Sequence, residues 1–115
     1  MKEQAKKQNL YEGMYVLNAH ISDDSRNHAF EKIKSGVTNR GGEIVKIHDQ
    51  GRRRLAYEIN RQKEGYYYLV YFRLPTDDVA DLWQEYHLNE NLIRFVTLRT
   101  ETVMDEIKFK QLPEQ

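Results

Sequence analysis

Three adjacent arginines are the residues of this chain with the clearest chemical potential. Arg52, Arg53 and Arg54 concentrate positive charge in a sequence of 115 residues whose formal net charge is zero. A guanidinium group presents a planar fork of donors that can form two parallel hydrogen bonds to one phosphate. The run therefore predicts either a contact with an anion such as nucleic acid, or a solvated strand edge that keeps other strands from pairing with it.

Charge is distributed unevenly along the chain around this run. Between residues 40 and 73, eight basic residues stand against four acidic ones, whereas residues 74–92 contain five acidic residues and no Lys or Arg. Such a dipolar chain can present one basic face to phosphate while it keeps another face away from it. The neutral total argues against a general polyanion binder.

The other residues that could do chemistry do not form a recognisable catalytic or metal site. Asp77, Asp78 and Asp81 could hold magnesium, but acids in a first helical turn more often interact with the helix dipole. The histidines show no metal-ligand spacing and lie near no nucleophile motif; they are His20, His28, His48 and His87. We therefore expect a protein that is not an enzyme and has no cofactor, no metal and no small-molecule substrate.

Alternation of apolar and polar residues predicts four strands around the arginine run. They span residues 10–19, 43–59, 66–74 and 93–100. In the second strand Leu55, Tyr57 and Ile59 share one face, and Gly51 marks a bulge or a kink. A polar connection at residues 61–65 suits a hairpin turn between the second strand and the third.

Two amphipathic segments predict helices between these strands. The first follows the N-cap Ser22 and ends at Gly41, and the second is capped by Thr76. With right-handed crossovers, this order places both helices on one face of a four-stranded antiparallel sheet, an α+β sandwich of the ferredoxin-like βαββαβ type. The domain spans residues 10–101, between a flexible N-terminal arm at 1–9 and a C-terminal tail at 102–115.

The second face of this sheet has no helix left to cover it. Its predicted side chains are too apolar to remain comfortably in water, so we expect a protein partner there. They are Met14, Val16, Tyr67, Leu69 and Tyr71. As an alternative, residues 65–71 faintly resemble the first ribonucleoprotein motif of RNA-recognition domains, whose aromatic side chains stack bases in single-stranded RNA.

Two stretches of the chain also resemble bacterial small-subunit ribosomal protein six. They are residues 51–60, which contain the arginine run, and residues 89–94, which lead into Leu98, Arg99 and Thr100. The likeness extends from about residue 11 to residue 100 in one order and spacing. The family usually has proline where this chain has Glu58, and Glu58 restores the backbone N–H that a proline lacks.

The resemblance implies a structural protein of the bacterial small ribosomal subunit, located in the cytoplasm. It implies pairing with small-subunit ribosomal protein eighteen through the apolar face, and binding to the central domain of the small-subunit ribosomal RNA. Basic side chains would contact RNA phosphate: Arg52, Arg53, Arg54, Arg61, Lys63, Arg94 and Arg99. Two points stay open. Arg53 and Arg54 point to opposite faces of a strand, so only some of the three adjacent arginines would contact RNA. Arg94 could instead form an ion pair with the acidic second helix. We expect no membrane association, since no apolar run approaches the length of a membrane span.

Overall fold

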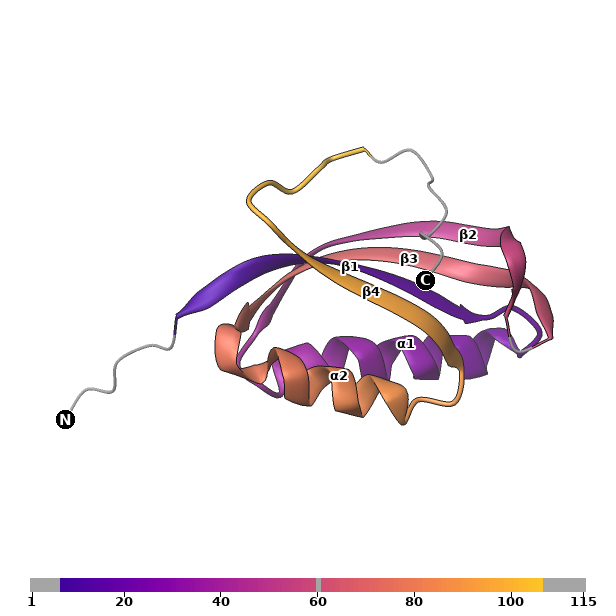
Figure 1. Cartoon of the computed structure of the whole chain (residues 1–115), viewed down its shortest axis with the longest axis horizontal. Helices are drawn as coiled ribbons and strands as arrows, with labels where there is room; N and C mark the ends of the chain where they lie inside the picture. The colour runs from indigo at the N-terminus through magenta and orange to yellow at the C-terminus, as the bar shows by residue number, and fades with distance from the viewer. Residues whose placement is uncertain (1–6, 60, 107–115) are drawn as a thin grey trace.

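The computed structural model describes residues 7–59 and 61–106, which form one antiparallel sheet and two helices. The elements follow in the order β1 (Gln8–Asn18), α1 (Asp23–Thr38), β2 (Glu43–Ile59), β3 (Gln62–Pro75), the short 3₁₀ helix η1 (Thr76–Asp78), α2 (Val79–His87) and β4 (Leu92–Thr100). The strand order in the sheet is β2-β3-β1-β4, and both helices lie on the same side of it (Figure 1). The predicted ferredoxin-like α+β fold is confirmed.

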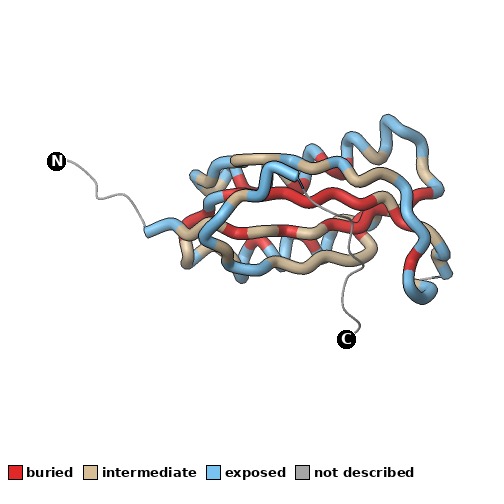
Figure 2. Tube along the Cα trace, turned by 90° about the horizontal axis from the view of Figure 1, so that it is seen from above, coloured by how far each residue is buried: buried red, intermediate tan, exposed pale blue. Residues whose placement is uncertain are grey.

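The main core lies between the sheet and the two helices. Tyr15, Phe72 and Leu82 are completely buried there, and the ring of Phe30 stacks on Tyr68 with 3.8 Å between ring centroids. Figure 2 shows the buried residues running along the middle of the molecule. This core follows from the alternation in β1 and β3 and from the apolar stripe of α1. Ser22 is the predicted N-cap of α1, with its Oγ accepting a hydrogen bond from the backbone N–H of Ser25 at 3.1 Å.

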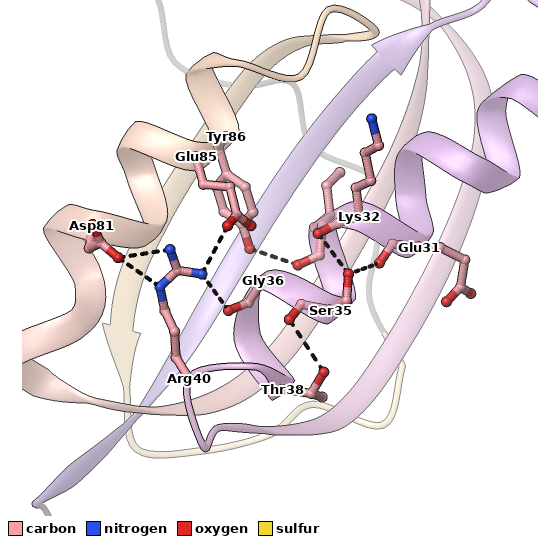
Figure 3. A network of polar contacts seen from close by, with 10 residues as sticks. Glu31, Lys32, Ser35, Gly36, Thr38, Arg40, Asp81, Glu85 and Tyr86 are labelled. Carbon is pink, nitrogen blue, oxygen red and sulfur yellow. Dashed lines mark hydrogen bonds and ion pairs between the residues drawn. The ribbon is translucent and has the colours of Figure 1, made fainter.

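Arg40 joins the two helices at the end of α1 (Figure 3). Its Nη2 lies 2.8 Å from a carboxylate oxygen of Asp81, and its Nη1 donates to the carbonyl oxygen of Gly36 and to Glu85. Close by, the Tyr86 hydroxyl donates to a carbonyl of α1 at 3.2 Å and lies 3.1 Å from the hydroxyl of Tyr15. These contacts fix α2 against α1. Because both helices lie on one side of the sheet, no helix covers its opposite face. We call that opposite face the helix-free face.

Several details differ from the predictions. β3 begins at Gln62, four residues before the predicted start, because the hairpin continues beyond the sheet core where polar residues form a ladder in solvent. Thr76 is not a helix cap but the first residue of η1, and the N-cap of α2 is Asp78, without a side-chain cap bond. Trp83 of the amphipathic helix α2 is 39% exposed, and its indole N–H donates to Thr97.

Candidate nucleic-acid and partner interfaces

The three adjacent arginines are all exposed and lie on the edge strand β2. Arg52 lies opposite Tyr66 of β3, which packs against the main core, so Arg52 lies on the helix side of the sheet. Arg53 lies opposite Gly65, where an added Cβ would meet Val16 of the helix-free face. Because side chains alternate along a strand, Arg54 returns to the helix side. The expectation that Arg53 and Arg54 point to opposite faces agrees with this register.

Neighbouring groups hold the head groups of Arg52 and Arg53. The Nη2 of Arg52 donates to the carbonyl oxygen of Ala19, and its Nη1 lies 3.5 Å from a carboxylate oxygen of Glu64. The Nε of Arg53 donates to the carbonyl oxygen of Gln50 at 2.9 Å. A guanidinium carries five N–H donors, so these bonds orient each head group and still leave donors for an anion.

The hairpin that follows the arginine run is strongly irregular. Arg54 lies opposite Glu64 and Ile59 lies opposite Gln62, so the four residues 55–58 of β2 stand against Lys63 alone. Leu55, the next residue after Arg54, follows the alternation onto the helix-free face, where it is buried against Val16 and Tyr67. Glu58 falls inside the irregular stretch, where the register gives it no directly opposite residue.

The predicted bulge at Gly51 is confirmed. The register shifts between Asp49 and Gly51, and Gly51 has a φ of 76°. That backbone conformation favours glycine, because a Cβ would crowd the neighbouring carbonyl oxygen. The turn at the hairpin tip also contains a residue with positive φ, Arg61 at 66°.

Arg94 lies on β4 directly opposite Val16, which places it on the helix-free face and away from α2. Its Nη1 donates to the hydroxyl of Tyr57, and its guanidinium carbon lies 5.9 Å from the centre of that ring. The alternative of an ion pair between Arg94 and the acidic helix therefore disagrees with the structure. Arg94 instead joins the hairpin through Tyr57.

The structure thus brings six of the seven predicted cations to one end of the sheet and separates the seventh. We call the six the hairpin cluster: Arg52, Arg53, Arg54, Arg61, Lys63 and Arg94. Arg99 lies opposite Tyr11, five residues along β4 from Arg94 and on the helix side. At about 3.3 Å per residue, this separates Arg99 from Arg94 by roughly 17 Å along the strand.

The predicted partner residues do line the helix-free face, but the chain itself covers most of them. Four are essentially buried and Met14 is half-buried; the four are Val16, Tyr67, Leu69 and Tyr71. Leu55 and Ile59 of the hairpin pack over Val16 and Tyr67. Residues 102–106, which belong to the predicted C-terminal tail, lie on the side of the sheet opposite the helices (Figure 1), and the backbone of Met104 lies close to Tyr71. The expectation of an open apolar face was therefore wrong for the isolated chain, because it took no account of segments that fold back.

Tyr71 shows how thoroughly this face is closed. Its hydroxyl donates to a carboxylate oxygen of Glu12 at 2.8 Å, and burial together with this hydrogen bond raises its pKa to about 12. Lys46 and His48 lie opposite Tyr71 and Leu69, so they share this face. The alternation of β2 indicated that Lys46 and His48 share a face, but no local pattern indicated what they would contact.

Within residues 7–59 and 61–106, no group of three or more His, Asp or Glu side chains is placed to hold a metal ion. No helix in the same residues is long and apolar enough to cross a membrane.

The model of the family described as ribosomal protein S6 matches residues 10–99. The chain belongs to the ribosomal protein S6 family. It is 64% identical over 110 residues to small ribosomal subunit protein bS6 of Protochlamydia amoebophila, with 96% of each chain covered. It is 54% identical over 114 residues to the bS6 of Chlamydia caviae, with 99% of this chain and 100% of the relative covered. The crystal structure of 30S ribosomal protein S6 from Thermotoga maritima superposes with a TM-score of 0.76 at 30% identity, covering 82% of this chain and 89% of that one.

Membership of the S6 family confirms the resemblance inferred from residues 51–60 and 89–94. The chain is a protein of the small ribosomal subunit. Its relatives are named as a ribosomal protein and not as an enzyme, in agreement with the prediction. Bacterial ribosomal proteins work in the cytoplasm, so the predicted location is also confirmed.

Proposed function

We propose that this S6 family protein binds the central domain of the small-subunit ribosomal RNA together with small-subunit ribosomal protein eighteen. The hairpin cluster is the observation that carries the RNA contact. Five of its six cations are exposed, and they extend from the end of the sheet, where an RNA backbone can approach them. Arginine suits this role because one guanidinium can form two hydrogen bonds to one phosphate.

The distribution of charge also supports an approach of RNA to the hairpin cluster. The five acidic residues of the stretch 74–92 lie on η1, α2 and the turn after α2, on the helix side of the sheet. Two of them, Asp81 and Glu85, already pair with Arg40. An RNA that approached from the helices would meet the unpaired acids, whereas one that approached the hairpin meets cations. Phosphate contacts would fix the position of the protein, and the shape of the RNA would supply most of the selectivity.

The helix-free face is the proposed site for protein eighteen. Its central residues are the apolar ones predicted for a partner, and no helix protects them. The face is continuous with the hairpin cluster, because Leu55 and Arg94 both contact or adjoin its residue Val16. A partner on this face would therefore lie beside the RNA-binding cations, and both proteins could contact one RNA together.

The alternative of a single-stranded RNA binder of the RNA-recognition type has less support. Such a domain stacks bases on exposed aromatic side chains of its central strands. Tyr67 and Tyr71 occupy those strands here, but they are 1% and 0% exposed. Bases could stack on them only after the covering segments had moved.

Filter binding over a salt series tests the proposal. The full chain would be titrated against a central-domain ribosomal RNA fragment, with and without protein eighteen, and against an unstructured RNA of equal length. We expect tight binding to the fragment only when both proteins are present. Tight binding of the chain alone to the unstructured RNA would favour the RNA-recognition alternative. Absence of binding to the fragment in every mixture would refute the proposal.

A further inference from the structure

The segment after β4 crosses the helix-free face from one edge of the sheet to the other. β4 and β2 are the two edge strands, with β1 and β3 between them. Residues 101–106 leave the end of β4 and reach side chains of β2. Figure 1 shows this segment on the side of the sheet opposite the helices, and Figure 2 shows the same region from above. We call residues 101–106 the C-terminal strap.

Three polar contacts hold the strap in place. The carbonyl oxygen of Met104 lies 2.8 Å from the Nε2 of His48, and the backbone of Met104 lies close enough to the hydroxyl of Tyr71 to offset part of the rise that burial causes in the pKa of that hydroxyl. The carboxylate of Asp105 lies 3.4 Å from the Nζ of Lys46. All three anchoring side chains belong to the helix-free face, so the strap occupies the surface proposed for the protein partner.

These anchors are few and solvent-accessible. The side chain of Asp105 is 93% exposed, and Met104 itself is 52% exposed. Exposed ion pairs contribute little, because water solvates both charges and ordering the side chains opposes the gain. The residue beneath the strap, Tyr71, is nevertheless completely buried. Weak contacts therefore hold the strap over an apolar surface. Such weak contacts allow another ligand to displace the strap.

We propose that the C-terminal strap is an intramolecular competitor that covers the helix-free face of the free chain and leaves it when the protein partner binds. This inference rests on the proposed pairing with protein eighteen. A binding surface that is closed for part of the time lowers the apparent affinity for its ligand in proportion to the closed fraction. A variant that opens the strap should consequently bind the partner more tightly.

Two full-length variants with the same change of charge test this role. Asp105→Lys places a cation beside Lys46 and repels the strap, whereas Glu106→Lys changes its exposed neighbour and serves as the control. Hydroxyl-radical labelling of Tyr71 in the free chain measures whether the strap is open, and titration with protein eighteen measures affinity. We expect Asp105→Lys to increase labelling of Tyr71 and to tighten binding up to about fivefold relative to Glu106→Lys, which is the effect of an exposed ion pair.

A second variant, Met104→Pro, removes the backbone N–H of the residue whose carbonyl meets His48, restricts the strap backbone, and leaves the charge unchanged. It should act in the same direction as Asp105→Lys. Unchanged labelling of Tyr71 in both variants would refute the idea that the strap covers this face. Weaker binding of protein eighteen by both variants would show that the strap is part of the partner interface and not a competitor. If labelling increases but no chain binds protein eighteen, the proposed pairing fails and the competitor role fails with it, although the strap itself stands.

Discussion

The orientation of the three adjacent arginines allows a quantitative prediction about RNA binding. Arg52 and Arg54 lie on the helix side of the sheet, whereas Arg53 lies on the helix-free face that we assign to the protein partner. One RNA backbone that passes the helix side of β2 can therefore reach two of the three guanidinium groups. Each phosphate contact contributes about 0.7 to 0.9 to the slope of log affinity against log salt. Replacing all three arginines with alanine should lower that slope by about 1.4 to 1.8, and not by the roughly 2.1 to 2.7 of three contacts.

The matching experiment uses filter binding to the central-domain RNA fragment in the presence of protein eighteen. Over a fourfold change in salt, a slope difference of about 1.4 to 1.8 corresponds to a change of roughly 7- to 12-fold in the ratio of wild-type to variant affinity. The double variant Arg52→Ala/Arg54→Ala should reproduce this change, and Arg53→Ala alone should leave the slope unaltered. A double variant at Lys32 and Lys34 of α1, which lie outside the hairpin cluster, matches the charge change of the double arginine variant and serves as its control. An unchanged slope in the triple arginine variant would remove the run from the RNA site, and three equal losses would refute the assignment of faces.

The remaining predictions concern stability. Arg40→Ala should lower the free energy of unfolding in urea by about 1 kcal/mol, because the bridge between the helices is lost while its acidic partners stay solvated. Gly51→Ala should lower it by about 1 kcal/mol through backbone strain alone, since no atom lies within 4 Å of the added Cβ. Gly65→Ala should be clearly more damaging in the same assay, because its Cβ would lie 2.3 Å from a buried valine methyl. Burial and hydrogen bonds to carboxylates raise the pKa of Tyr66 and of Tyr71 to about 12. The two tyrosines therefore contribute fully to stability below pH 10, and this contribution is lost between pH 10 and 12. Absorbance at 295 nm should show late tyrosine ionisation that coincides with alkaline unfolding. Tyr71→Phe should reduce the loss of stability over this pH range.

Sequence patterns predicted the elements that are buried on one face and solvated on the other. The alternation around Tyr15 and Val16 assigned both residues to the correct faces of β1, because a period of two reports directly which side chains share a face. The stripe of α1 was equally clear. β3 was predicted too short, since Gln62 and Glu64 pair with β2 in the part of the hairpin where neither face is buried, and alternation then carries no signal.

The candidate site was predicted less completely, for a different physical reason. The cations of the hairpin cluster are close in sequence, apart from Arg94, so composition alone brought most of them together. Arg99 was grouped with them by its charge, but strand register places it on the opposite face and at a distance. The closure of the helix-free face depends on contacts such as Met104 with His48, which are 56 residues apart. Residues 103–105 show no apolar periodicity, and local sequence patterns do not report contacts between residues so far apart in the chain.

The place of β1 in the sheet has a consequence for the order in which the protein can fold during synthesis. β1 is the first strand to be made, yet it lies between β3 and β4, and its Leu10 pairs with Thr100 of the last strand. The main core contains residues of β1 and also Leu92, so it cannot close until almost the whole chain has left the translating ribosome. Contacts of such long sequence separation slow folding, because a large loop must be ordered before they form. A nascent chain that stops before β4 would expose one edge of β1, and the sheet can be completed only after β4 has emerged.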